Sequence, residues 1–569
     1  MEKAKRVLST IKSWAKQLCI PLALLTANTA FADERRPSEV KLVVQITVDG
    51  LRGDLLRRYQ PSFLQDGFRR LTEGGVWYTN AHHEHANTET IVGHTTLATG
   101  AHPSEHGMVG NTWFNREDGR LGYNIEDPDY SLLPLPGISG EGEQLDPSQA
   151  VAASDGRSPR NILVSTFGDE LYKSNLGESK IIGISGKDRS AVAMAGHVGK
   201  AFWMSVETGV FQTSDFYYET YPQWVLDWNA KRPADAAIGS TWSLYDPLGT
   251  YLLGTNDDRI YETDLKGFGR TFPHKYGAPS DGLFYTQIIL SALGDQLTAS
   301  FGEAAVLGEG LGQDDVTDYL SLSFSGVDAT NHFFGPSSLE SEEMVRMLDK
   351  TLARLFSFFD AEIGRENVLY VLSADHGMPE MPEQMAEFGK QTFRKGHTAL
   401  AEALKQSISE AFGVGQPIKA FFRPYIYFDH DAIEAAGADR RAIERLIVDQ
   451  LAATPGIAIA MPREPFPEQL GNFVEAPIRN NFHPSRSGDI YVVQSPYSFL
   501  LDPGPIAVMH GSPWRYDTHV PVIFAGPGIK PMQTGRYIGT TDVAVTLANI
   551  FGTTQPSGAS GEVLSEVLR

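Results

Sequence analysis

Carboxylate and imidazole side chains recur at the ends of apolar runs in this sequence. The run Leu42 to Val48 leads into Asp49, and the run Tyr319 to Phe324 leads into SGVDATNH, which holds Asp328 and His332. The last two residues are four apart, so they would share one face if the segment turned helical. Asp49 alone is weak evidence, since an Asp-Gly pair most often makes a turn.

Two more runs carry the same kinds of residue. Val368 to Leu372 precedes Asp375 and His376, and His519 stands directly before the run Val520 to Phe524. Three aspartates and three histidines at four strand ends suit two divalent ions, with zinc the first expectation for nitrogen and oxygen ligands. Two ions roughly 4 Å apart can hold the entering and leaving oxygens of a displacement at phosphorus. The six side chains therefore predict phosphoryl transfer.

The stretch HANTETIVGHTTLATG, residues 85–100, offers a nucleophile in Thr88 or Thr90. A helix that starts here would present free N–H groups to a phosphate, so a helix start and a nucleophile are compatible interpretations. The spacing does not choose between the two threonines.

The elements that must position these residues follow from the apolar runs. Together with Lys180 to Ile184, the runs predict five buried strands, and a 3 or 4 residue apolar spacing predicts a helix over Ser341 to Ile363. Strands that alternate with helices indicate an α/β fold with a central, mostly parallel sheet and helices on both faces. In such folds ligands bind at the carboxyl ends of the strands.

Two regions break this alternation and are expected to be insertions that form caps. They span about residues 199–279, rich in aromatic side chains, and about 379–512, with a predicted helix over Asp431 to Ala453. We expect residues 33–569 to form one catalytic domain around them.

The first 32 residues are typical of a secretory signal peptide. A basic start is followed by the apolar run Leu18 to Leu25 and by Ala30-Phe31-Ala32, an A-x-A cleavage site. The run is shorter than the roughly 20 residues of a membrane span, and no later segment is apolar enough to span either. We therefore expect export to the periplasm or beyond. Cys19 is the only cysteine, so the exported chain would have no disulfide and no thiolate.

The chain has 569 residues and a formal net charge of −22. Residues 1–32 hold five basic side chains and one acidic, so the exported chain would carry −26. This negative charge argues against nucleic acid as a partner. If the substrate is an anion, bound metal ions would supply the local positive charge that attracts it. The acidic clusters at residues 115–120 and 124–130 could hold a structural Ca²⁺. They lack the spacing of an EF-hand loop, and solvated charge is the favoured interpretation.

The segments VDGLR, TETIVGHTTLATG, GVDATNH, SADHG and YDTHVP, in this order, resemble the alkaline phosphatase superfamily. Within it the sequence is most similar to the threonine-nucleophile alkaline phosphatases of the PafA type. The resemblance implies Thr90 as the nucleophile, with Thr88 as its competitor. It also implies how the six ligands divide: one metal beside the nucleophile, bound by Asp49, Asp375 and His376, and one beside the leaving group, bound by Asp328, His332 and His519.

The same resemblance indicates phosphate monoesters, and not diesters, as the substrates. Lys187 and Arg189 match the K-x-R signature of the monoesterases, and Asn111 matches an asparagine that holds a phosphate oxygen. Without the resemblance, the first two would be ordinary surface charge and Asn111 a turn residue. A dianionic monoester has more oxygen charge to neutralise, and a guanidinium can grip two oxygens at once.

We therefore expect an exported, metal-dependent phosphomonoesterase that acts on small phosphate monoesters through a phosphothreonine intermediate. A phosphodiesterase or nucleotide pyrophosphatase of the same superfamily is the nearest alternative, and a periplasmic metal- or phosphate-binding protein is the non-enzymatic one. A sulfatase is disfavoured, because no convincing C/S-x-P-x-R context is present. The other histidines near the motifs are expected to cap, pack or support; they are His82, His83, His85, His94 and His510.

Overall fold

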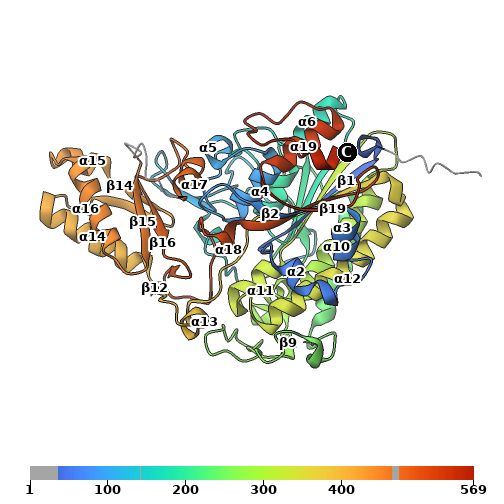
Figure 1. Ribbon diagram of the computed structural model, residues 1–569, viewed down its shortest axis with the longest axis horizontal. Helices are drawn as coiled ribbons and strands as arrows, with labels where there is room; N and C mark the ends of the chain where they lie inside the picture. The colour runs from blue at the N-terminus through green and yellow to red at the C-terminus, as the bar shows by residue number, and fades with distance from the viewer. Residues whose placement is uncertain (1–35, 141, 464–472, 569) are drawn as a thin grey trace, which may run out of the picture. The chain divides into compact units, whose positions relative to one another are not determined.

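A nine-stranded mixed sheet forms the centre of the protein. The computed structural model describes residues 36–140, 142–463 and 473–568, so the expected signal peptide lies outside the described residues. Figure 1 shows the sheet with helices on either side. The strands, in spatial order, are β19 (Met532–Gly539), β2 (Val76–His82), β18 (His519–Ala525), β11 (Val368–Ser373), β1 (Leu42–Val48), β10 (Asp318–Phe324), β5 (Ile181–Ser185), β6 (Lys200–Met204) and β7 (Phe211–Gln212).

Five neighbouring strands, β11, β1, β10, β5 and β6, run parallel, and Leu42 at the start of β1 lies opposite Asp318 and Val368. β18 runs antiparallel to both of its neighbours, β11 and β2. The five strands expected from apolar runs are all present, within one residue at each end. Every residue of β1 is buried, as expected for a strand covered on both faces.

The side chains of β1 alternate between two hydrophobic cores, one on each face of the sheet. Leu42, Val44, Ile46 and Val48 belong to one core and Val43 to the other. The first core receives apolar residues from α2 (Leu55–Tyr59), α3 (Phe68–Gly74), α10 (Ala292–Glu309), α11 (Gly326–Phe334) and α12 (Leu339–Glu362). The second receives them from α4 (Thr90–Thr99), α6 (Phe167–Ser174), α7 (Asp188–Ala195) and α19 (Asp542–Phe551). The α/β architecture predicted from the sequence is thus confirmed, and α12 matches the expected helix.

The region 379–512 contains a second sheet with its own apolar core. Its strands, in spatial order, are β13 (Ile418–Phe422), β14 (Tyr425–Phe428), β16 (Ile490–Gln494) and β15 (Ile457–Pro462). This core includes side chains from α14 (His397–Phe412) and α16 (Arg440–Ala452), and Figure 1 shows the orange helices beside the sheet. The expected helix Asp431 to Ala453 is two helices, α15 (His430–Ala435) and α16. Gly437 takes a left-handed φ of 63° between them, and the Asp439 carboxylate caps α16.

The region 199–279 is less separate than the sequence suggested. β6 and β7 lie inside it and extend the central sheet, because their aromatic residues pack into the main core: Phe202 and Phe211 both contact Phe301 of α10. The rest of the region holds α8 (Gln223–Ala230) and the short pair β8 (Thr241–Trp242) and β9 (His274–Lys275).

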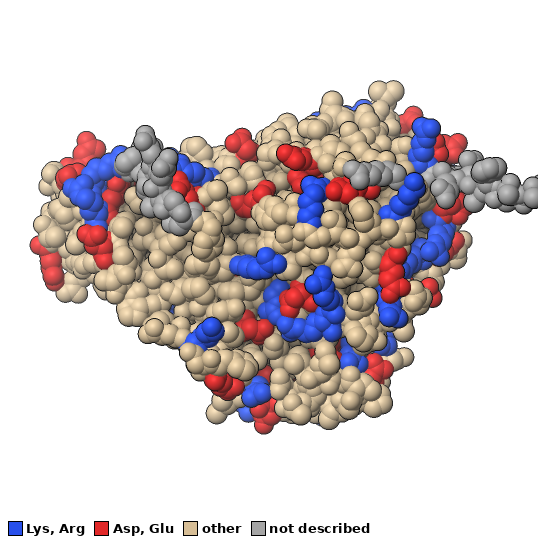
Figure 2. Space-filling model, in the orientation of Figure 1, with Lys and Arg blue, Asp and Glu red and all other residues tan. Residues whose placement is uncertain are grey.

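Charged side chains are mixed on the face in Figure 2, where a group of basic residues lies near α2 around an acidic one. Directly before α2, the Asp54 carboxylate lies 2.6 Å from both Arg52 and Arg58. In the described ranges, no helix has the length and apolar character needed to cross a membrane.

Candidate active site

Four parallel strands end side by side at the site. Asp49 follows β1, Asp375 and His376 follow β11, and Asp328 lies in the first turn of α11, just after β10. Lys187 follows β5, directly before α7. Since β11, β1, β10 and β5 are successive parallel neighbours, their carboxyl ends meet at one edge of the sheet. The topology therefore gathers residues that lie up to 327 positions apart (Asp49 to His376).

The first group of potential ligands is Asp49, Asp375 and His376, all fully buried. The Nε2 atom of His376 lies 3.3 Å from Asp49 Oδ1 and 3.4 Å from Asp375 Oδ2. Burial and the neighbouring Asp328 would raise the pKa of Asp49, but Lys187 and His376 outweigh them and lower it to about 2. Three ligand atoms of suitable type thus converge in a space closed to solvent.

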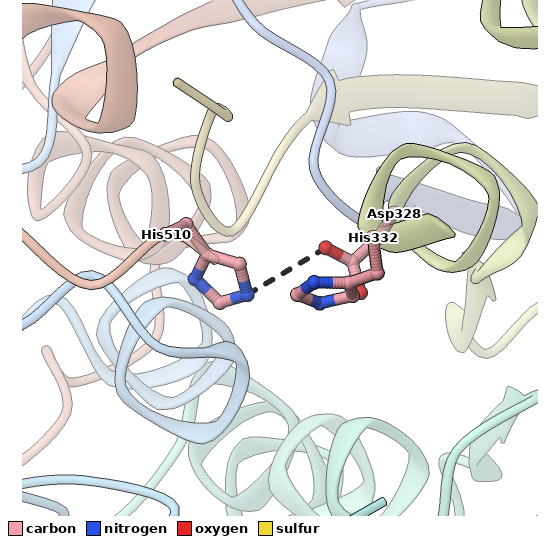
Figure 3. Close-up of side chains that lie close together, drawn as sticks. All are labelled: Asp328, His332 and His510. Atoms are coloured by element: carbon pink, nitrogen blue, oxygen red, sulfur yellow. Dashed lines mark ion pairs between the residues drawn. The ribbon is translucent and has the colours of Figure 1, made fainter. Parts of the chain in front are cut away.

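The second group is Asp328, His332 and His510, whose side chains converge in Figure 3. Asp328 and His332 lie one turn apart on α11, with Oδ2 to Nε2 at 3.3 Å. His510 approaches from a loop, and its Nε2 lies 3.6 Å from Asp328 Oδ1. The i, i+4 spacing noted in the sequence does place the first two on one helix face.

Backbone carbonyls orient all three histidines of the two groups. The Nδ1 atoms of His332, His376 and His510 lie 2.8, 2.8 and 2.7 Å from the carbonyl oxygens of Val508, Gly377 and Thr88. Because a carbonyl only accepts, each Nδ1 must carry a hydrogen, which leaves Nε2 as the nitrogen that faces the carboxylates. This arrangement, with one ring nitrogen bonded to the backbone and the other free, is typical of metal-binding histidines.

His519, which the sequence analysis expected as a ligand, is not part of either group. Its Nε2 lies 3.0 Å from the carbonyl oxygen of Thr79, and its ring stacks on His82. Its Nε2 is therefore engaged by the backbone, away from the carboxylates of both groups. The third member of the second candidate group is His510, which was expected only to cap, pack or support. Both histidines occur in the segment HGSPWRYDTH, and only the fold distinguishes them.

The two groups form one continuous site. His376 Nε2 lies 4.0 Å from Asp328 Oδ1, and the rings of His376 and His510 stack with centroids 3.5 Å apart. Lys187 Nζ lies 2.7 Å from Asp49 and 2.5 Å from Asp328. Burial would lower the pKa of Lys187, but the two carboxylates raise it above its ordinary value.

The donor set fits divalent ions. Among the described residues, Asp328 Oδ1, Asp375 Oδ2 and His376 Nε2 are buried and take part in no hydrogen bond. Burial would lower the pKa of His376, but Asp375, Asp49 and Asp328 raise it to about 10, a sign of how strongly this pocket favours positive charge. Buried charges persist when they are paired or coordinate metals, and mixed carboxylate and imidazole ligands suit zinc.

Thr90 is the first residue of α4, and Arg189 Nη2 lies 3.4 Å from its hydroxyl oxygen. The Thr88 hydroxyl, in contrast, is engaged by Ser512, donating to its carbonyl at 3.1 Å and accepting from its N–H at 3.0 Å. Thr90 is thus the threonine that lies beside the Arg189 guanidinium at a helix start.

Lys187, Arg189 and Asn111, the expected phosphate-binding residues, line one cavity of about 250 Å³ together with Asp328, His332 and His510. Asn111 is held at the start of α4, since its side-chain oxygen accepts from the N–H of Ile91 at 3.2 Å. Arg189 is held by Asp146, with Nη1 to Oδ2 at 2.5 Å. Asp146 could not be predicted from the sequence, because it lies in a loop without a motif.

α4 approaches the strand end of β11 very closely. A side chain on Gly93 would lie 1.9 Å from the carbonyl oxygen of Asp375, so only glycine fits there. The next residue, His94, places Nδ1 3.1 Å from Asp375 Oδ2. This contact fits the supporting role expected for His94.

Two acids of the second cluster considered for calcium, residues 124–130, pair with arginines. Glu126 lies 2.7 Å from Arg120, and Asp127 lies 3.2 Å from Arg160. In the part of the chain that is described, neither cluster joins a group of potential metal ligands.

Comparison with known proteins gives a family match over most of the chain. The model of the family described as type I phosphodiesterase / nucleotide pyrophosphatase matches residues 43–513. This span contains Asp49, Thr90, Asn111, Lys187, Arg189 and the second ligand group through His510.

Individual relatives match almost the whole chain. Alkaline phosphatase PhoV of Synechococcus elongatus is 32% identical and covers 97% of this chain and 100% of the relative. A protein of Myroides odoratus named calcium-transporting ATPase is 31% identical over 93% of this chain and 94% of its own length. The crystal structure of wild-type alkaline phosphatase PafA superposes with a TM-score of 0.83 at 29% identity, covering 93% of this chain and 99% of that one.

Proposed function

The chain belongs to the type I phosphodiesterase/nucleotide pyrophosphatase family, and we propose that it hydrolyses phosphate monoesters with Thr90 as nucleophile. It is similar to alkaline phosphatases along nearly its whole length, as the sequence motifs indicated. The observation that carries the proposal is the contact between Arg189 and the Thr90 hydroxyl, in a cavity that Lys187 also lines.

Two divalent ions, zinc in our proposal, would be held by Asp49, Asp375 and His376 and by Asp328, His332 and His510. When bound, such ions supply positive charge at the attacking and leaving oxygens of the displacement. His510 replaces His519 in this ligand set.

The residues of the chain account for binding and orientation. Arg189, Lys187 and Asn111 would hold the non-bridging oxygens of the ester, and the free N–H groups at the start of α4 would add to their field. The Thr90 oxygen would form the new bond to phosphorus as the bond to the ester oxygen breaks, giving a phosphothreonine and an alcohol. Water would then cleave the phosphothreonine, releasing phosphate and restoring the hydroxyl.

Two cationic side chains favour a monoester over a diester. A dianionic phosphoryl group offers Arg189 and Lys187 more negative oxygen charge than a diester, in which an organic group replaces one of those oxygens. We therefore propose monoesters as the physiological substrates, and the phosphodiesterase reaction remains the alternative.

A two-substrate assay tests this choice. The kcat/KM of the zinc-loaded enzyme is measured for 4-nitrophenyl phosphate and for bis(4-nitrophenyl) phosphate, and we expect the monoester to be favoured. A higher value for the diester would contradict the proposal. The variant Thr90→Ala should lose at least about 1000-fold in kcat while its bound metal, measured by elemental analysis, is unchanged. Thr88→Ala is the matched control, and a larger loss there would reassign the nucleophile.

We also propose export, on the basis of the basic, apolar and A-x-A pattern of residues 1–32. Sequencing the N-terminus of the protein from a periplasmic fraction should give Asp33 as the first residue. Full-length protein confined to the cytoplasm would contradict this proposal.

A further inference from the structure

We propose that the enzyme selects monoesters whose leaving group is apolar and carries no negative charge of its own. This substrate class rests on the proposed function, since it concerns the part of the same cavity that lies beyond the phosphate-binding residues. Neither the family nor the names of the relatives specify it.

The cavity has an extensive apolar wall. Beside the phosphate-binding cations it is lined by Trp203, Met204, Leu290, Phe333, Ile506 and Met509. Phe333 lines the same cavity as His332 and His510, so this apolar wall and the second candidate ligand group face one space. That group lies on the leaving-group side in the proposed mechanism. An apolar leaving group would displace water from this wall, which is favourable.

The cations of the cavity are all engaged. Lys187 is held by Asp49 and Asp328, and Arg189 by Asp146. The other arginine in the lining, Arg157, lies 2.9 Å from Asp188 and over the ring of Tyr123. Within the described residues of the lining, Lys187 and Arg189 would serve the transferred phosphoryl group, which leaves no unpaired lysine or arginine for a second anion.

Two carboxylates at the cavity strengthen this selection. Asp155 and Glu207 line it, both are exposed, and neither makes an ion pair in the described part of the chain. A leaving group with a carboxylate or a second phosphate would approach like charges and an apolar wall at once. Like-charge contacts and the loss of hydration of an unpaired anion both oppose binding.

A pair of aryl phosphates tests the effect of leaving-group charge while the reactivity of the leaving group stays nearly constant. Phenyl phosphate and 3-carboxyphenyl phosphate carry the same phosphoryl group, and their phenols have similar acidity, so they differ mainly in the added carboxylate. We expect kcat/KM to be at least about tenfold higher for phenyl phosphate. Equal values, or a preference for the carboxylated ester, would overturn the inference while leaving the proposed function intact. Absence of metal-dependent hydrolysis of both would instead refute the proposed function.

A variant without the two cavity carboxylates tests whether they cause the preference for uncharged leaving groups. The double substitution Asp155→Asn and Glu207→Gln should raise the ratio of kcat/KM for 3-carboxyphenyl phosphate to that for phenyl phosphate about threefold or more. Glu178→Gln, at an exposed glutamate that does not line the cavity, is the matched control and should change neither value. The same ratio in wild type and in the double variant would overturn the assignment of the selectivity to this cavity.

Discussion

The direction of one lone pair distinguishes His510 from His519. His510 gives its Nδ1 hydrogen to the carbonyl of Thr88 and presents Nε2 to Asp328, whereas the Nε2 of His519 is bound to Thr79. A histidine binds a metal only through a nitrogen that is free of hydrogen. At the scale of single residues, the backbone hydrogen bond of His510 therefore turns its other nitrogen toward a carboxylate, whereas His519 belongs to neither candidate group.

This difference predicts opposite results for two substitutions. His510→Ala should lose one of two bound metals and at least about 100-fold in kcat/KM, because even residues that only support a metal ligand are worth 10–100-fold. His519→Ala should keep both metals, since its ring packs against His82 and Gly53 instead. Elemental analysis and the 4-nitrophenyl phosphate assay check both. Loss of metal in His519→Ala with full retention in His510→Ala would restore the assignment made from the sequence.

The sequence predicted the chemistry of the site better than it predicted which residues form the site. Asp49, Asp375 and His376 come shortly after predicted strands, so their convergence was expected for a parallel sheet. His510 could not be identified, because it lies in a loop, and no periodicity constrains where a loop places its side chains. Asp146, the partner of Arg189, was missed for the same reason.

At the scale of elements, the second sheet reaches the active site through one buried arginine. Arg423, between β13 and β14, donates to the carbonyl of His510 at 3.0 Å and lies 3.7 Å from Glu89, the residue before Thr90. Glu89 accepts from the N–H of Asn111 at 2.6 Å. The insertion therefore helps to fix both sides of the cavity.

Arg423→Met keeps much of the buried stem and removes these contacts. We expect kcat/KM to fall about tenfold or more, because small displacements of positioned groups are costly in catalysis, while the circular dichroism spectrum is retained. Arg441→Met on the exposed side of α16, where Arg441 pairs with Glu444 at 3.1 Å, is the matched control. Equal effects of the two substitutions would show that the insertion contributes stability alone.

α6 carries an ion pair that should make stability depend on pH. His197 Nδ1 lies 2.9 Å from Asp169, and the hydrogen bond from His197 to Asp169 raises the pKa of His197. A raised pKa contributes stability that is present below the unfolded value, about 6.5, and is lost as pH rises through the folded value. His197→Gln should therefore lower the free energy of unfolding more at pH 5.5 than at pH 8.5. The difference should stay below about 1 kcal/mol, because the side chain is partly exposed to solvent screening. Urea unfolding at both pH values measures it, and a larger effect at pH 8.5 would contradict it.

The strands were predictable because a strand buried on both faces is a continuous apolar run. Their order was not, since the antiparallel placement of β18 between β11 and β2 depends on contacts distant in the sequence. The break between α15 and α16 was missed because the apolar spacing continues across Gly437, whose left-handed φ interrupts the helix.

For the whole molecule, the metals are expected to contribute to stability as well as to activity. The ligands come from segments between Asp49 and His510, so an unfolded chain cannot present them together, and an ion that binds only the folded state stabilises it. When free zinc exceeds the dissociation constant, each site adds about 1.4 kcal/mol to the free energy of unfolding for every tenfold increase in free zinc. Two sites should therefore give about twice this slope.

To measure this slope, metal is removed from the protein with a chelator, and the free energy of unfolding is then determined in buffers that fix several free zinc concentrations. The slope for wild type should be about twice that for His510→Ala, which should retain the group formed by Asp49, Asp375 and His376. Thr90→Ala, which removes a hydroxyl outside both groups, should keep the slope of wild type. Equal slopes for wild type and His510→Ala would mean that the second group holds no zinc in the folded protein, and the proposed role of Asp328, His332 and His510 would then have to be abandoned.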